Sequence, residues 1–202
     1  MTKPYFISSK ILLVAILLSL NGCLGMPQSV SPIKDFELNR YLGRWYEIAR
    51  LDHSFERDLV QVSAEYSLRD DGGVTVTNRG FSEAKNTWKE AVGKAFFVEE
   101  ANTGYLKVSF FGPFYGSYVI FELDKDNYQY AFVSGPDTSY LWLLARTPTV
   151  EQKLLDRFIS QAKERGFPTE QLIFVPQKKE KQHTPSSQNN SHPGPPDRDN
   201  KT

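Results

Sequence analysis

Residues 41–49 read YLGRWYEIA, with Gly43 and Trp45 two positions apart just where aromatic and aliphatic side chains begin to dominate. Aromatic and β-branched residues favour a strand. Successive side chains of a strand point to opposite faces, so Trp45 and Glu47 lie on one face while Tyr46 and Ile48 lie on the other. The stretch therefore predicts a first strand that carries a bulky indole and a carboxylate on the same face.

The period-two pattern of this stretch recurs along the chain. Candidate strands lie at 45–51, 62–68, 74–81, 94–98, 106–111, 118–123, 128–133 and 140–146. Between them stand short segments rich in Gly, Asp, Asn and Pro, which are typical of tight turns. Such regular hairpin spacing favours an antiparallel meander, and closing it removes the exposed sheet edges. The sequence predicts an all-β fold, an eight-stranded antiparallel up-and-down barrel wide enough for one small ligand.

One helix is expected after the last of these strands. Thr149 precedes a segment at 151–165 whose apolar residues recur at helical spacing, and Gly166 follows it. A polar cap before such a stripe and a glycine after it are typical of helix ends. We expect this C-terminal α-helix to pack outside the barrel by its apolar face.

Arg146 ends the eighth candidate strand, and residues 131–136 read AFVSGP. A GxW motif on the first strand, eight strands, a late Arg and a helix, in that order, resemble the lipocalin family. Over residues 36–176 the chain is similar to bacterial outer-membrane lipocalins and apolipoprotein D-like proteins. The resemblance implies that Gly43, Trp45 and Arg146 meet at the closed base as structural residues. A guanidinium over an indole gives a cation–π contact there.

The orientation of the eighth strand is consistent with this arrangement. If Arg146 and Trp45 face inward, Trp142 and Leu144 do so as well, by alternation. The outward-facing residues are then also apolar, which does not suit a solvated wall: Leu141, Leu143, Ala145, Tyr46 and Ile48. The apolar stripe of the helix would cover them.

Alternation also predicts the lining of the interior. The expected ligand-binding residues are Leu106, Val108, Phe110, Tyr130, Phe132, Trp142 and Leu144. An aliphatic and aromatic lining suits an acyl chain, with polar groups fixing its head. The alternative is that these side chains simply fill the barrel. Glu47 is also expected to face inward, where a carboxylate needs a partner or becomes protonated.

The connections at the open end of the barrel carry apolar side chains. We expect four mouth segments, at 52–59, 82–91 with Trp88, 112–116 and 134–140. Phe55, Phe114 and Tyr115 are expected at loop tips. They could form a lid, a homodimer contact or a membrane contact, or they could fold back on the rim.

The ends of the chain indicate export and anchoring. Residues 1–22 combine Lys3 and Lys10 with an apolar run too short to span a bilayer, which predicts a signal peptide. LNGC at 20–23 resembles the bacterial lipobox, so Cys23 is expected to carry the lipid anchor and residues 23–35 to form a tether. In bacterial lipoproteins an Asp directly after the lipidated Cys typically retains the protein at the inner membrane. This chain has Leu24 at that position, so the resemblance implies transfer to the outer membrane. Residues 177–202 lack apolar side chains other than Pro and are expected to be a disordered tail.

Composition excludes several functions. Lys and Arg total 24 and Asp and Glu also total 24, so no basic excess points to nucleic acid. The single Cys permits no disulfide framework and no cysteine zinc site. The three His residues, His53, His183 and His192, accompany no nucleophile motif. We therefore expect no catalytic residue, metal or cofactor.

The sequence thus predicts a lipid-anchored lipocalin on the periplasmic face of the bacterial outer membrane. It would bind and store or transport a fatty acid or lysophospholipid. The alternative is an interaction module with a filled barrel that acts through its mouth loops.

Overall fold

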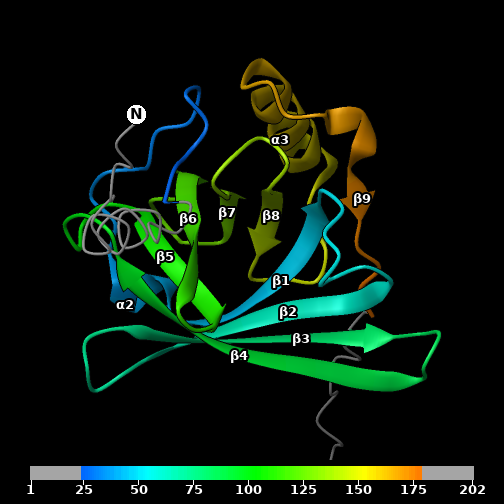
Figure 1. The fold of residues 1–202 in the computed structure, drawn as a ribbon. Coiled ribbons are helices and arrows are strands. Elements are labelled where there is room, and N and C mark those ends of the chain that lie inside the picture. The colour runs from blue at the N-terminus through cyan, green and yellow to red at the C-terminus, as the bar shows by residue number, and fades with distance from the viewer. Residues whose placement is uncertain (1–23, 179–202) are drawn as a thin grey trace, which may run out of the picture.

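The computed structural model describes residues 24–178 (Figure 1). Its strands are β1 Gly43–Arg50, β2 Leu59–Leu68, β3 Val74–Ser82, β4 Thr87–Phe97, β5 Tyr105–Phe111, β6 Phe114–Leu123, β7 Tyr130–Ser134, β8 Leu141–Ala145 and β9 Ile173–Phe174. Its helices are α2 Leu38–Tyr41, α3 Gln152–Glu164 and the 3-10 turn η1 Thr169–Gln171. Within the described residues, no helix is long and apolar enough to cross a bilayer.

The sheet closes on itself through β1. Each strand from β2 to β8 pairs antiparallel with the next, and β1 pairs with both ends of the series. Trp45 lies opposite Ala64 on β2, while Tyr46 lies opposite Ala145 on β8. The predicted eight-stranded antiparallel barrel is thus confirmed. Figure 1 shows β2, β3 and β4 as long strands lying side by side.

The C-terminal segment completes the wall where β1 and β2 separate. β1 pairs with β2 only from Gly43 to Tyr46, and further along it pairs with β9 instead. Gln177 was expected to begin the tail, but its side chain donates to the carbonyl oxygens of Glu47, at 2.8 Å, and Val62, at 2.9 Å. Gln177 is therefore part of the barrel. Residues 179–202 lie outside the described residues.

Two hydrophobic clusters lie on opposite sides of the barrel wall. The outer one lies between the wall and α3 and contains Leu141, Leu143 and Ala145 together with Phe158 and Ala162 of the helix. The predicted helix and its covering of these outward residues are confirmed. α3 begins at Gln152 with Glu151 as N-cap, so Thr149 does not cap it.

The segment that precedes α2 is packed against the barrel, although the sequence predicted a tether. Val30 is buried, and the Ser29 hydroxyl donates to the carbonyl oxygen of Arg165 at 2.7 Å. The Ile33 amide donates to the carbonyl oxygen of Ile120 at 2.9 Å. Apolar side chains at Met26, Val30 and Ile33 explain this packing. Cys23 and residues 1–22 lie outside the described residues.

One expected mouth loop is mostly strand. β4 begins at Thr87, so Trp88 lies in the strand rather than in a loop at 82–91. Trp88 pairs with Phe81 of β3, with ring centroids 5.5 Å apart. The first half of β4 is exposed on both faces, which removes the alternation that a sequence pattern needs.

Candidate ligand-binding site

The base of the barrel is closed by Arg146 and Trp45. The Arg146 guanidinium lies 3.9 Å from the centre of the Trp45 ring system. It also donates to the carbonyl oxygens of Arg44 at 2.8 Å and Arg40 at 2.7 Å. The Trp45 indole in turn donates to the carbonyl oxygen of Tyr41 at 2.7 Å. These contacts tie β8, β1 and α2 together beneath the interior.

Gly43 gives the chain beside this guanidinium a backbone conformation that other residues rarely adopt. Its φ of 88° is in the left-handed region that favours glycine. A side-chain carbon built on Gly43 would lie 3.6 Å from Nη1 of Arg146. The structure therefore brings together all three residues expected at the base.

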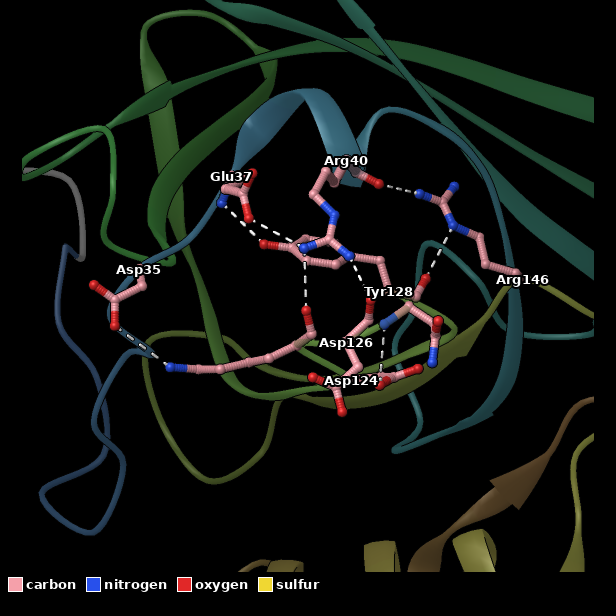
Figure 2. A network of polar contacts seen from close by, with 9 residues as sticks. Asp35, Glu37, Arg40, Asp124, Asp126, Tyr128 and Arg146 are labelled. Carbon is pink, nitrogen blue, oxygen red and sulfur yellow. Dashed lines mark hydrogen bonds and ion pairs between the residues drawn. The ribbon is translucent and has the colours of Figure 1, made fainter.

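A second arginine extends the base network (Figure 2). The Arg40 guanidinium lies 4.2 Å from the centre of the Tyr128 ring. It donates to the carbonyl oxygens of Lys125 at 3.1 Å and Asp126 at 2.6 Å. The Tyr128 hydroxyl accepts from the amide of Glu37 at 3.0 Å. These bonds fix α2 against the connection between β6 and β7, so the base is a braced floor.

The lower part of the interior is filled. Trp45 is fully buried, and Leu106 and Leu144 are each 5% exposed within the same cluster. Val74 and Ile120 from other strands also belong to it. An acyl chain therefore has no space directly above the floor.

The upper part of the interior is lined by side chains that solvent reaches. Val108, Phe110 and Trp142 pack against the inner cluster but are only half-buried. A ligand that enters from the mouth would meet these residues first. Five of the seven expected ligand-binding residues thus face the interior, namely Leu106, Val108, Phe110, Trp142 and Leu144.

The prediction that Tyr130 and Phe132 face inward is wrong. Phe132 packs edge-on against Phe158 of α3, with ring centroids 5.0 Å apart. The Tyr130 hydroxyl accepts from Nη1 of Arg157 on the same helix at 2.7 Å. The smaller Ala131 and Val133 face the interior instead. The lower interior is already filled, so it has room only for small side chains of β7. The large rings of β7 instead pack against the apolar face of α3.

The wall is open along part of β4. β4 pairs with β5 only from Lys94 to Phe97. Ala91 and Lys89 share the inner face with Ala95 by alternation, yet both are exposed. Solvent therefore reaches the interior between β4 and β5 as well as through the mouth.

Three tyrosines place hydroxyl groups inside the barrel. The Tyr118 hydroxyl lies 2.7 Å from that of Tyr41 and 2.8 Å from that of Tyr66, so the three form a hydrogen-bonded chain. Burial raises the pKa of all three well above the usual value for tyrosine. The hydroxyls are therefore neutral, and three protons serve two bonds. One donor is left for another acceptor.

A buried charged cluster lies below the mouth. Nη1 of Arg50 donates to Oε1 of Glu47 at 2.8 Å, and Nη2 donates to the carbonyl oxygen of Glu56 at 2.8 Å. The Trp142 indole donates to Oε2 of Glu56 at 3.1 Å. Burial raises the pKa of Glu47 well above its usual value and also raises that of Glu56. The guanidinium thus binds the Glu47 carboxylate, while the Glu56 carboxylate accepts from the Trp142 indole, and both carboxyl groups are more easily protonated than exposed ones.

Sequence reasoning missed the role of Arg50 in this cluster. The register of β1 shifts between Glu47 and Ala49, so strict alternation fails at this point. The alternation of β1 placed Glu47 inward, and the sequence required a partner for it. A search for a cation three residues downstream could have found Arg50.

His53 joins two mouth connections. Its ring stacks on Tyr140, at 4.7 Å between centroids, and on Phe55, at 5.2 Å. It is buried, and its Nε2 has no hydrogen-bond partner among residues 24–178. Burial, followed by the positive charge of Arg50, lowers the pKa of His53 to about 4. The imidazole is therefore neutral at physiological pH and acts as an aromatic spacer.

The outer surface offers less suitable sites. A hollow of about 540 Å³ on the outer wall is lined largely by polar side chains, including Arg44, Arg79 and Glu90. Its charged lining does not suit an acyl chain. In the part of the chain that the structure describes, no group of three or more His, Cys, Asp or Glu residues could hold a metal ion.

A family model described as a Lipocalin-like domain matches residues 36–177. The chain belongs to the lipocalin family. Among solved structures, it resembles insecticyanin from Manduca sexta with a TM-score of 0.60 and 20% identity, covering 76% of this chain and 87% of that one. At this identity the likeness concerns the fold alone.

Curated relatives are much more similar. The chain is 71% identical over 158 residues to "Outer membrane lipoprotein Blc" of Vibrio cholerae, covering 78% of this chain and 92% of that protein. It is 47% identical to the protein of the same name from Escherichia coli K12, covering 75% and 85%. Apolipoprotein D of Bos taurus is 33% identical, covering 57% and 63%. This lipocalin is accordingly a lipid-anchored outer-membrane protein that binds hydrophobic ligands.

Proposed function

We propose that this lipocalin binds a fatty acid or lysophospholipid and stores or transports it on the periplasmic face of the outer membrane. The observation that carries this proposal is the division of the interior into a braced, filled base and a solvent-accessible apolar upper part. Val108, Phe110 and Trp142 line the upper part. The acyl chain would lie among them with its polar head toward the mouth.

Two polar groups support a ligand with one polar end. In the tyrosine chain the half-buried Tyr118 is the central member, and its hydroxyl lies between those of Tyr41 and Tyr66. The Glu47–Arg50–Glu56 cluster lies below the mouth, where a head group would come to rest. Apolar lining with a few fixed polar groups is typical of small-molecule sites.

Titration with a fluorescent fatty acid tests the proposal. Val108→Trp fills the open part of the interior, whereas Lys107→Trp adds the same ring to the adjacent position on the outer face of β5. We expect Val108→Trp to weaken binding about tenfold or more, equivalent to about 1.4 kcal/mol, and Lys107→Trp to leave it within about twofold. Circular dichroism checks that both variants fold.

Competition with unlabelled lipids then separates the two ligand classes. A lysophospholipid that displaces the probe at lower concentration than the matching fatty acid identifies the former as the preferred ligand, and the reverse result identifies the latter. If the natural chain shows no saturable binding, the proposal fails. A filled barrel acting through its mouth loops, including a homodimer formed by those loops, is then the better account.

A further inference from the structure

Three phenylalanines are exposed at the mouth of the barrel. Phe55 is 57% exposed, Phe111 80% and Phe114 69%. Phe55 lies between β1 and β2, and the other two flank the turn between β5 and β6. In an up-and-down barrel alternate connections lie at the same end. The β1–β2 and β5–β6 connections therefore lie at the same end as the β7–β8 connection. Several large apolar side chains exposed at one end of a barrel indicate an interaction surface there.

The anchored end of the chain reaches the barrel at this same end. A side-chain carbon built on Gly25 would lie 3.6 Å from the carbonyl oxygen of Pro136, which belongs to the β7–β8 connection. Leu24 directly follows the predicted lipidation site, Cys23. Consecutive Cα atoms are about 3.8 Å apart, so the acyl anchor starts within a few ångströms of the first described residue.

The exposed rings are held in place by the framework. Phe55 stacks on His53, which stacks on Tyr140 of the β7–β8 connection. Phe111 and Phe114 are register partners across the β5–β6 turn. The apolar groups are thus presented on paired strands and on a stack that links two connections.

We propose that the mouth of the barrel rests on the membrane, with Phe55, Phe111 and Phe114 inserted at the level of the lipid head groups. Aromatic side chains favour this interfacial region. The anchor and the rings then engage one bilayer surface, so a ligand would pass between bilayer and barrel without crossing water. The proposal concerns orientation on the membrane and goes beyond ligand binding itself.

The charged residues at this end do not supply a net attraction to anionic lipid. On the β1–β2 connection, Arg57 forms an ion pair with Asp52, with Nη2 and Oδ2 2.5 Å apart. The other exposed charged side chains on the mouth connections are Asp58, Glu83, Lys85 and Asp137, of which only Lys85 is a cation. The attraction must therefore be chiefly apolar, and we expect added salt not to release the mouth from the bilayer, because screening acts on charges.

The test uses the mature lipidated protein on vesicles of phosphatidylethanolamine and phosphatidylglycerol. Cys23 is the only cysteine and its thiol is acylated, so one introduced cysteine can be labelled with an environment-sensitive fluorophore. Phe111→Cys places the label at the mouth. Leu68→Cys is the matched control, because Leu68 is 59% exposed at the base end of β2. Lipids brominated near the head group serve as the quencher.

We expect the label at Phe111 to be quenched at least about twofold more than the label at Leu68. Equal quenching at the two positions, or none at either, would overturn the proposal. A doubled mass in solution, together with an unquenched Phe111 label, would identify the surface as a contact between two copies and would also overturn it.

A triple variant, Phe55→Ser, Phe111→Ser and Phe114→Ser, supplies a second readout. We expect the anchored variant to move away from the bilayer, so that a label placed on the turn residue Gly112→Cys is quenched about twofold less than in the natural background. Binding of a soluble fluorescent fatty acid should persist, which separates this test from that of ligand binding. Unchanged quenching in the triple variant would contradict insertion of the rings.

Discussion

Arg146 stabilises the base through its planar guanidinium, which lies over Trp45 and donates to two carbonyl oxygens. Lysine keeps the charge but lacks this planar fork. We expect Arg146→Lys to lower the free energy of unfolding by about 1–3 kcal/mol, measured by urea denaturation. Arg79→Lys is the control, since Arg79 lies farther from Trp88, at 5.4 Å, and is exposed. A loss of equal size at both positions would contradict the role of the base.

His53 makes stability depend on pH. Its pKa in the folded protein is about 4, whereas an unfolded histidine titrates near 6.5. Below about pH 6.5 the unfolded state binds a proton that the folded state does not, so stability falls as pH falls. Relative to His53→Phe, which keeps an aromatic ring in the stack, the natural chain should lose about 2 kcal/mol between pH 7 and 4.5.

Urea denaturation at several pH values measures the difference between the natural chain and the His53→Phe variant. The subtraction removes the opposite contributions of Glu47 and Glu56, whose raised pKa values favour the folded state on acidification. Parallel curves for the two proteins would show that His53 has an ordinary pKa.

At the scale of single residues, the sequence predicted which residues form the base but not all of those that line the interior. The positions of Gly43, Trp45 and Arg146 were predicted correctly because the family motif implies that these three residues meet at the closed base. Tyr130 and Phe132 were predicted to face inward because they are the larger residues of their strand. Alternation allows either face of the strand to point inward, and side-chain size does not decide which face it is. Arg50 was missed because a register shift interrupts β1.

Among the elements, α3 packs on the barrel through an apolar face whose largest fully buried side chain is Phe158. Phe158 is fully buried against Phe132 on β7. We expect Phe158→Ala to destabilise the protein by about 3–5 kcal/mol, because it removes a large side chain and leaves a cavity. Lys153→Ala, on the exposed side of the helix, should change stability by less than about 0.5 kcal/mol. Thermal unfolding followed by circular dichroism compares the two, and similar losses would exclude this packing.

The C-terminal segment is a second element with a measurable role. Gln177 bridges β1 and β2 through two carbonyl oxygens. We expect Gln177→Ala to cost about 1–2 kcal/mol and to speed hydrogen exchange at the mouth end of β2. Gln171→Ala is the control, since that amide contacts only the exposed Glu170 side chain. Unchanged exchange in Gln177→Ala would show that the segment does not close the wall.

The strands and α3 followed from periodicity, and their errors have physical causes. The first half of β4 is exposed on both faces, and β9 is too short to show a period. The segment before α2 looked like a tether, since its few apolar residues are spaced without a period. Only the assembled barrel shows which surface they cover.

At the scale of the whole molecule, the two ends of the barrel differ in structure and in proposed role. The base is filled and braced by Arg40, Arg146 and Trp45, while the mouth carries the open lining and the exposed rings. The order of the strands, the late arginine and the helix predicted this architecture. The opening beside β4 was not predictable, because it depends on where the β4–β5 pairing stops.

The most direct test of an acyl ligand in the upper interior is mass spectrometry of lipids extracted from the protein, purified without residues 1–23 from its bacterial host. We predict a fatty acid or lysophospholipid at a near-stoichiometric amount, and substantially less of it in the Val108→Trp variant than in Lys107→Trp. A folded barrel that yields no acyl lipid, and that takes up none when fatty acid is added, would contradict the account.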